Sequence, residues 1–313
     1  MMLIKPKFWD KKNSLISIFF FPFSLIYLIA IFLKKKFTKI KEFKIPIICV
    51  GNIYVGGTGK TPISILLANE IKNFGKKAVI LRSFHESHSD EHELIKKKFD
   101  NLILSKKRVN GIIEAEKSNF DVVILDDGLQ DYAIKKDLSI VCFNHNQLIG
   151  NEMIIPSGPL RENLSALKKV DIVIINGDKN KDFENKILKI NKYLQIFYSK
   201  YVPINLDWFK NKKLFAIAGI GNPENFFKTL EENNLVIEKK LILPDHYRLS
   251  EKEVLSIVDI AKKNKLEIVM TEKDYFKFKN FNQKDINYLE VSVQIDQREK
   301  FFNMIKNLYD KKI

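Results

Sequence analysis

Cysteine is scarce in this sequence. Only Cys49 and Cys142 occur among its 313 residues, and each lies inside an apolar run, at 47–50 and 140–143. Two isolated thiols in such runs predict reduced, buried side chains in strands and exclude a disulfide framework. We therefore expect the catalytic part of the chain to face a reducing compartment.

Other features are missing as well. The sequence contains no internal repeat, no low-complexity linker, no zinc-ligand spacing and no aromatic-basic RNA-binding motif. These absences argue against a non-enzymatic adaptor and predict no nucleic-acid partner. The net charge of +15 has two explanations that the sequence leaves open. One is a polyanionic partner such as anionic lipid or a phosphorylated substrate, and the other is a genome biased toward Lys, Ile, Asn and Phe.

Charge is also absent from a long segment near the N-terminus. Residues 14–33 carry no charged side chain, and lysines flank them at 11–12 and 34–36. An apolar helix of this length reaches about 30 Å, which matches the hydrocarbon layer of a bilayer. A cleaved signal peptide is not expected, because the run is long and no small-residue cleavage site follows it.

Three interpretations of this segment stay open. The first, which we favour, is a monotopic anchor whose flanking lysines bind anionic headgroups. The second is a single membrane span, although Pro22 would kink it and lysines on both flanks give little asymmetry for orientation. The third is a buried helix of a soluble domain. Residues 1–40 are accordingly predicted to form an N-terminal membrane-anchoring helical segment.

After this segment, short apolar runs alternate with amphipathic stretches. This pattern predicts an α/β fold with a parallel sheet covered by helices on both faces. A first strand–helix series extends to about residue 175, and residues 179–200 are rich in Lys and Asn without a clear strand signal. A second series then begins, in which Ser250 and Glu253 form the capping box of a helix. We predict one α/β domain at 41–200 and a second, smaller α/β domain at 201–313.

The first strand is followed by a phosphate-binding loop. Residues 51–62 read GNIYVGGTGKTP, in which glycines let backbone N–H groups point at phosphate oxygens at the start of a helix. Lys60 is expected to reach the β- and γ-phosphates, and Thr61 to bind Mg²⁺. The strict GxxxxGK[ST] pattern would place its first glycine at Tyr54. The predicted ATP-binding residues are Tyr54, Val55, Gly56, Gly57, Thr58, Gly59, Lys60 and Thr61.

Val55 bears on the class of nucleotide-binding protein. Partition-type and nitrogenase-reductase-type ATPases carry an additional lysine at this position, just before the paired glycines. Its absence argues against a dimerising switch ATPase. The P-loop NTPase-like domain is therefore expected to serve another reaction.

A second polar cluster follows the strand at 122–125. Asp126, Asp127 and Gln130 come directly after it, and ligands of α/β proteins bind at the carboxyl ends of strands. A carboxylate in this place suits a Walker-B role on Mg²⁺, so these three residues and Thr61 are candidate metal ligands. The sequence leaves open which aspartate contacts the metal, and an exposed DDG turn is the alternative.

Several further motifs accompany the phosphate loop. They are DDGLQDY at 126–132, GNEMIIPSGPLRE at 150–162, AGIGNPENFF at 218–227, PDHY at 244–247 and TEKD at 271–274. Together these motifs resemble one known family, the tetraacyldisaccharide 4′-kinases, which are the lipid A 4′-kinases of Gram-negative bacteria. The resemblance implies transfer of the ATP γ-phosphate to the 4′-hydroxyl of an acylated glucosamine disaccharide 1-phosphate, with ATP and Mg²⁺ as cofactors. It also implies peripheral or monotopic attachment to the cytoplasmic face of the inner membrane, with anionic lipids as partners. The alternative is a membrane-associated P-loop ATPase without a lipid acceptor.

The same resemblance suggests roles for individual residues. Asp90 matches the proposed base and His246 its partner, although residues 89–92 read SDEH, without the family's flanking Gly and Pro, and the loop after Arg82 is shortened. Asp90 has an alternative role as a helix N-cap before 91–98, and His246 as a surface loop residue. Lys60 and Asp127 complete the predicted catalytic set. Arg82, Arg161 and Glu162 are candidate substrate ligands, unless the last two only pair with each other.

Overall fold

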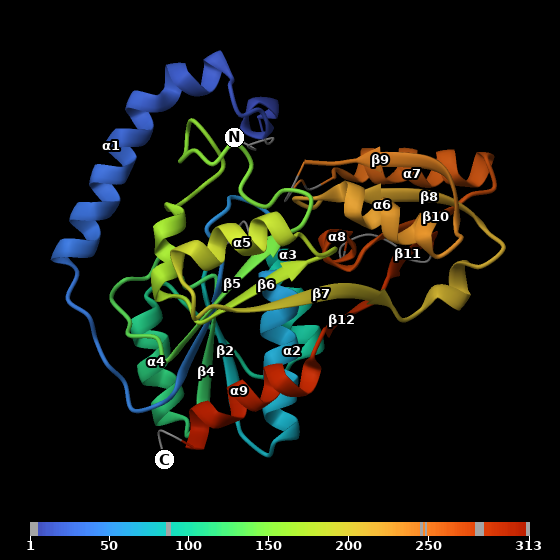
Figure 1. Ribbon diagram of the computed structural model, residues 1–313. Coiled ribbons are helices and arrows are strands. Elements are labelled where there is room, and N and C mark those ends of the chain that lie inside the picture. The colour runs from blue at the N-terminus through green and yellow to red at the C-terminus, as the bar shows by residue number, and fades with distance from the viewer. Residues whose placement is uncertain (1–5, 86–88, 245–246, 248, 279–284, 311–313) are drawn as a thin grey trace. The chain divides into compact units, whose positions relative to one another are not determined.

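The computed structural model describes residues 6–85, 89–244, 247, 249–278 and 285–310, and the contacts of the chain divide it into two compact units (Figure 1). The first unit comprises Lys5–Phe84, Phe99–Lys200 and Gln294–Ile313. The second comprises His85–Lys98 and Tyr201–Val293. One division between the units falls at Lys200 and Tyr201, and the others separate His85–Lys98 and Gln294–Ile313 from their sequence neighbours.

The first unit is built on an eight-stranded sheet with the order β12-β7-β6-β5-β1-β4-β2-β3. All pairings from β7 through β3 are parallel. Its strands are β1 (Ile47–Gly51), β2 (Ala78–Ser83), β3 (Leu102–Ser105), β4 (Val122–Asp126), β5 (Leu138–Asn144), β6 (Ile172–Asn176), β7 (Gln195–Pro203) and β12 (Val291–Ile295). Its helices are α1 (Leu15–Phe37), α2 (Lys60–Asn73), α4 (Arg108–Lys117), α5 (Lys181–Ile190) and α9 (Arg298–Asp310), with short 3₁₀ turns η1 (Lys7–Asp10) and η3 (Leu164–Lys169).

Side-chain alternation along the buried strands produces two apolar faces. On β1, Ile47 and Cys49 pack with Ile112 and Ala115 of α4. Since successive side chains of a strand point to opposite faces, Ile48 and Val50 face the other side, where α2 contacts the same strands. Figure 1 shows α2 and α4 on opposite sides of the sheet. The predicted parallel sheet with helices on both faces is confirmed, and Cys49 and Cys142 are buried free thiols.

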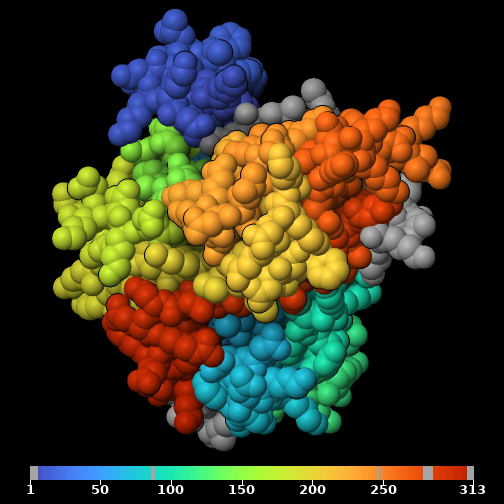
Figure 2. All heavy atoms as spheres, turned by 90° about the vertical axis from the view of Figure 1, so that its right-hand side faces the viewer, coloured from blue at the N-terminus to red at the C-terminus, as the bar shows by residue number. Residues whose placement is uncertain are grey.

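Two features of the first unit differ from the sequence-based expectation. Strand β7 occupies a stretch in which no strand was expected, because its alternating apolar residues are embedded among Lys and Asn and its stability comes from pairing with β6. Helix α9, expected in the C-terminal domain, packs on the first unit instead. Its Phe302 meets Phe74 at the end of α2, its Phe301 meets Phe197 of β7, and Figures 1 and 2 both show it beside α2.

The second unit has a four-stranded, all-parallel sheet of order β11-β10-β8-β9. Leu214 and Ala216 of β8 pack toward α6, while Phe215 and Ile217 pack toward α7, so helices cover both faces. Its elements are α3 (Ser89–Lys98), η4 (Leu206–Phe209), β8 (Lys213–Ala218), α6 (Pro223–Glu232), β9 (Val236–Ile242), α7 (Glu251–Lys263), β10 (Glu267–Thr271), α8 (Glu272–Tyr275), η5 (Phe276–Phe278) and β11 (Ile286–Leu289). The predicted capping box of Ser250 and Glu253 is present at the start of α7.

Helix α3 belongs to this second unit, although the sequence placed it in the domain at 41–200. Lys98 of α3 forms an ion pair of 2.7 Å with Glu272 of α8, whose side chain is buried. A buried carboxylate needs a cationic partner, so this ion pair binds α3 to α8 within the second unit.

Helix α1 has an inverted distribution of side chains. Its two buried residues are Ser17 and Ser24, whereas Phe19 and Ile26 are 71% and 65% exposed. By length and composition the helix could cross a membrane, and in the described part of the chain it alone meets both criteria. Burying polar residues while exposing apolar ones reverses the pattern of a water-facing helix and indicates an apolar surrounding for the outer face.

Core packing in the second unit gives a direct stability prediction. Leu230→Ala should lower the free energy of unfolding by about 2–5 kcal/mol, because Leu230 is fully buried in the cluster between α6 and β8. Leu255→Ala removes the same atoms from an exposed position on α7 and should change the free energy of unfolding by less than about 0.5 kcal/mol. Urea denaturation of both variants measures the difference, and equal losses would contradict this core assignment.

Candidate functional site

The phosphate loop and the acidic strand end lie at one edge of the first sheet. Strands β1 and β4 are parallel neighbours, paired from Ile47 with Val123 to Val50 with Asp126, so their carboxyl ends meet. Between β1 and α2 the backbone turns through Gly56 and Gly59, with φ of 122° and 87°. These positive φ values favour glycine and let the loop curl at the N-terminus of α2. Tyr54 contributes backbone only, because its side chain is buried in the core.

Asp126 organises the centre of this site. Its carboxylate is fully buried and accepts hydrogen bonds from the hydroxyl of Thr61 at 3.0 Å and from Ser64 at 3.1 Å. The guanidinium of Arg82 on β2 pairs with the same carboxylate and also donates to the Thr61 hydroxyl at 3.1 Å. An uncompensated buried charge is costly, so the Asp126 carboxylate and the Arg82 guanidinium hold each other in place.

Asp127 faces the other side of the loop. Its φ of 57° turns the chain away from the strand, and its carboxylate lies 3.6 Å from the Lys60 ammonium and 3.1 Å from Arg161. Burial by itself raises the pKa of Asp127, but the neighbouring charges of Lys60, Arg161, Arg82 and Arg108 outweigh it and hold this pKa well below its usual range. Burial lowers the pKa of Lys60, and the charge of Asp127 opposes that effect. The opposite charges of Asp127 and Lys60 therefore stabilise each other across the 3.6 Å contact.

The candidate substrate ligands Arg161 and Glu162 engage different partners. Arg161 binds Asp127 and donates to the Gln130 side-chain oxygen at 3.4 Å. Glu162 is buried and accepts a hydrogen bond from the Gln130 amide at 3.1 Å and a charge-assisted contact from Lys35 at 2.5 Å. The Gln130 amide also donates to the Asn52 carbonyl at 3.0 Å, so Gln130 connects the phosphate-loop segment with Arg161 and Glu162, and its metal role stays a prediction.

Asp90 lies in the second unit, so its environment is described separately. It is buried in the first turn of α3, and its carboxylate lies 3.8 Å from the Lys273 ammonium, which also pairs with Glu91 at 3.0 Å. Because α3 begins at Ser89, Asp90 stands inside the helix, and the alternative of an N-cap before residue 91 is wrong. His246 lies outside the described residues.

With this geometry established, the chain can be compared with known proteins. The family model of tetraacyldisaccharide-1-P 4′-kinases matches residues 16–310. The chain belongs to this family. A relative from Pelagibacter ubique named tetraacyldisaccharide 4′-kinase is 40% identical over 99% of this chain and 100% of its own length. A Francisella tularensis subsp. novicida relative of the same name is 33% identical over 93% of this chain and 99% of its own.

A solved structure supports the fold. The chain is similar to LpxK from Aquifex aeolicus, described as an "apo" form in complex with ATP, with a TM-score of 0.71 and 22% identity over 94% of this chain and 100% of that one. At this identity the likeness concerns the fold. The α/β fold class and the family resemblance that the sequence predicted are both confirmed.

Several residues that contact the site were not among those predicted from the sequence motifs. Ser64 lies one helical turn after Lys60 on α2, which is a spacing the sequence could have revealed. Asn52, inside the glycine-rich run, donates hydrogen bonds to the Gly56 carbonyl at 3.2 Å and to Thr58 at 3.0 Å, and so shapes the loop. Lys35 on α1 and Lys273 on α8 are distant in sequence from their partners, and no sequence signal links them.

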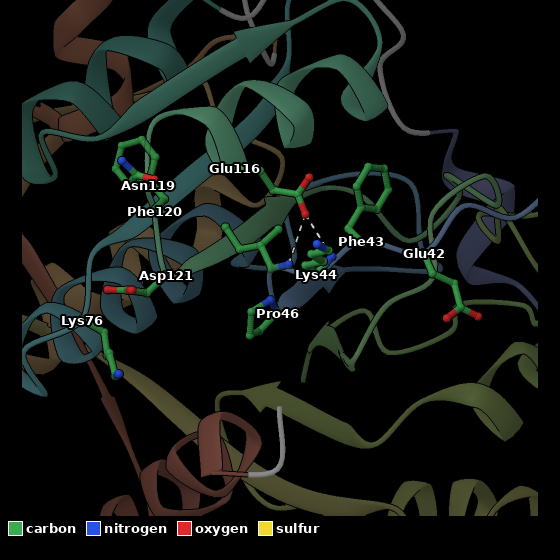
Figure 3. A pocket seen from close by; sticks show the side chains of 10 residues that line it. Glu42, Phe43, Lys44, Pro46, Lys76, Glu116, Asn119, Phe120 and Asp121 are labelled. Atoms are coloured by element: carbon green, nitrogen blue, oxygen red, sulfur yellow. Dashed lines mark hydrogen bonds between the residues drawn. The ribbon is translucent and has the colours of Figure 1, made fainter. Parts of the chain in front are cut away.

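A cavity in the first unit lies apart from this site. It has a volume of about 780 Å³ and is lined by residues 42–46, Lys76, Glu116 and 119–121 (Figure 3). These residues precede β1, β2 and β4, at the edge of the sheet opposite the phosphate loop. Glu116 there accepts hydrogen bonds from the backbone N–H groups of Lys44 and Ile45, which fixes the entry into β1. The cavity is therefore separate from the phosphate loop and from the acidic end of β4.

The buried Arg82–Asp126 pair yields a stability prediction. Arg82→Met should lower the free energy of unfolding by about 3–5 kcal/mol, because it leaves a buried carboxylate without its cation. The control is Arg298→Met, which removes a guanidinium from a half-exposed pair with Glu70 and should cost at most about 1 kcal/mol. Denaturant unfolding of the detergent-solubilised proteins tests the difference, and comparable losses would show that the Asp126 site tolerates an unpaired charge.

Proposed function

We propose that this chain transfers the γ-phosphoryl group of ATP to the 4′-hydroxyl of an acylated glucosamine disaccharide 1-phosphate, the step that its family name describes. One observation carries the proposal. Lys60 and Thr61 of a glycine-bent loop meet Asp127 and Asp126 at the end of the adjacent strand. Phosphoryl transfer depends on positioning and charge neutralisation, which this arrangement of ammonium, hydroxyl and carboxylates supplies.

The residues present fit a magnesium–nucleotide complex. The Thr61 hydroxyl and the Asp126 carboxylate lie 3.0 Å apart and offer the hard oxygen ligands that Mg²⁺ prefers. We assign Thr61 and Asp126 to Mg²⁺, and we assign Asp127 to holding Lys60 and Arg161. A bound Mg²⁺ would neutralise phosphate charge, while the loop amides and Lys60 bind the phosphate oxygens.

The reaction balances with the residues assigned to it. The acceptor hydroxyl oxygen forms a bond to the γ-phosphorus, the bond from that phosphorus to the β–γ bridging oxygen breaks, and ADP leaves. The hydroxyl proton passes to a base, which we assign to Asp90 on the family resemblance. The nearby Lys273 ammonium favours the ionised form of Asp90, so that it can orient the hydroxyl and accept the proton.

The three candidate substrate ligands receive different roles in this proposal. Arg161 keeps about a quarter of its side chain exposed and can still bind an anionic or hydroxyl group of the acceptor. Arg82 and Glu162 have side chains that are 7% and 4% exposed and are occupied by Asp126 and Lys35. Arg82 and Glu162 therefore position the ligands of the site without touching the substrate themselves.

We infer that α1 is a monotopic anchor at the membrane where the lipid substrate resides. The Ser24 hydroxyl, near the middle of the helix, donates a hydrogen bond to the Ile154 carbonyl at 2.8 Å. If α1 spanned the membrane, this contact would place the loop around Ile154 inside the hydrocarbon layer. Irregular backbone with unsatisfied polar groups is excluded from that layer. With its docked face on the protein, the helix can offer only its outer apolar face and its terminal lysines to one leaflet.

The kinase proposal is tested by Lys60→Ala. Loss of the ammonium should reduce phosphorylation of the acylated disaccharide at least about a hundredfold, because the transferring phosphoryl group loses a preorganised positive charge. The measurement is ATP-dependent formation of product, with phosphorus NMR locating the new phosphate on the 4′-oxygen. Lys72→Ala, on the exposed end of the same helix, should retain activity within about twofold.

This assay also separates the proposal from its alternative. Steady ATP hydrolysis with no phosphate on the disaccharide would support a P-loop ATPase without a lipid acceptor. Lys60→Ala activity close to that of the unaltered protein would remove the loop from the mechanism. The match over residues 16–310 favours the kinase.

The anchor proposal predicts the effect of charges on the outer face of α1. Introducing Phe19→Glu and Ile26→Glu together should lower binding to anionic vesicles at least about a hundredfold, since two apolar side chains no longer enter the membrane. Tyr193→Glu places the same charge on an exposed aromatic residue elsewhere in the first unit and serves as the control. Vesicle cosedimentation measures both, and unchanged binding of the double variant would assign membrane attachment to another surface.

A further inference from the structure

One narrow stripe of α1 docks the helix on the protein. Ser17, Ser24, Leu28 and Lys35 follow one another at intervals of seven, four and seven residues, which keeps them on one face of a helix. Ser17 accepts a hydrogen bond from the Asn151 amide at 3.0 Å, and Leu28 packs on the core cluster of the first unit. The stripe therefore continues from one end of the helix almost to the other.

The surface that receives this stripe is the segment at 150–162. Besides Asn151, the segment supplies the Ile154 carbonyl and the Ser157 N–H to Ser24, at 2.8 Å and 3.1 Å, and Glu162 to Lys35 at 2.5 Å. The segment thus contacts α1 at three levels and ends at Arg161 and Glu162, next to the phosphate loop.

The same segment is hydrogen-bonded to the backbone that enters the phosphate loop. The Arg161 N–H donates to the Ile53 carbonyl at 2.7 Å, and the Val55 N–H donates to the Pro159 carbonyl at 2.8 Å. Val55 immediately precedes Gly56. A displacement of this segment would therefore move the first residues of the loop.

Side chains form a second route from the helix to the loop. Lys35 binds Glu162, the Gln130 amide donates to Glu162 at 3.1 Å, and the Gln130 oxygen accepts from Arg161 at 3.4 Å. Arg161 pairs with Asp127 at 3.1 Å, and Asp127 lies 3.6 Å from the Lys60 ammonium. All of these residues belong to the first unit.

The charges along this route link Lys35 to the position of the Lys60 ammonium. Glu162 is 4% exposed in its side chain and has Lys35 as its cation, whereas Asp127 shares Lys60 and Arg161. Lys136 also interacts electrostatically with Glu162, but Lys35 is the cation that forms an ion pair with it. Without Lys35 the buried carboxylate would lose that ion pair, and the next cation along the chain of contacts is Arg161. If Arg161 turned toward Glu162, Asp127 would depend on Lys60 alone and draw that ammonium away from the phosphates.

We propose that Lys35 is a positioning residue for phosphoryl transfer, so that the membrane-associated helix α1 is a structural part of the phosphate site in addition to its role as an anchor. The inference rests on the proposed kinase function. In this proposal Lys35 acts through Glu162, and the docked stripe of α1 holds the segment at 150–162 in place.

The test compares two neighbouring lysines in the full-length protein. Lys35→Met and Lys36→Met should weaken binding to anionic vesicles equally, by about fivefold, because each removes one basic charge near the surface. With a short-chain acceptor in detergent, Lys35→Met should lower kcat at least tenfold and weaken MgATP binding. Lys36→Met, which changes an exposed residue, should leave both within twofold. Lys35→Arg should restore most of the lost kcat.

A double variant tests the route through Glu162. If Lys35 acts through that carboxylate, adding Lys35→Met to Glu162→Gln should cause less than a twofold further loss of kcat. Thermal unfolding identifies a variant that fails to fold, and Lys35→Gln then replaces Lys35→Met. Equal kcat values for Lys35→Met and Lys36→Met, or full additivity in the double variant, would overturn the inference. If the unaltered protein forms no 4′-phosphate, the kinase proposal is refuted instead. In that case, comparing MgATP binding by Lys35→Met and Lys36→Met still tests the role of Lys35.

Discussion

Two adjacent carboxylates at the end of β4 need cations nearby to balance their negative charge, and the rest of the site depends on this constraint. Asp126 is fully buried and Asp127 is partly buried, so each requires cations close by. Parallel pairing of β4 with β1 and β2 brings those cations from the loop and from Arg82. The order of the strands therefore decides which charges meet. The left-handed φ of Asp127 then separates the two carboxylates, so that Asp127 lies beside Lys60 and Arg161 while Asp126 lies against Thr61.

The second unit shows a comparable use of buried charge in its TEKD motif. Thr271 caps α8, and Asp274 is fully buried, accepting hydrogen bonds from the Gly219 N–H at 2.7 Å and the Thr271 hydroxyl at 2.6 Å. Lys277 neutralises Asp274, while Lys273 reaches Asp90. One short turn thus fixes the loop before α6 and the start of α3, and the motif has a structural explanation beside any role in catalysis.

The N-terminal helix α1 bears both on the proposed membrane attachment and on the phosphate site. Most of its apolar residues face outward, whereas Ser24 and Lys35 have hydrogen-bond partners on the protein. A lipid kinase must bring an acceptor from a bilayer to a nucleotide in water. In the proposed function, a helix docked on the segment that carries Arg161 would place the membrane surface near the phosphate loop of the first unit.

Much of this protein was readable from the sequence alone. Glycine at Gly56 and Gly59, the strand–helix context of Lys60 and the acidic end of β4 are local features, and local chemistry restricts what they can form. The alternation of apolar runs likewise determined the α/β class. Tertiary structure alone decided that β7 forms a strand, that α3 and α9 join the units they do, and that Asp126 rather than Asp127 lies against Thr61. It also decided that Lys35 reaches Glu162, 127 residues further along the chain. Such contacts depend on packing between distant segments, and neither residue carries a local signal of its partner.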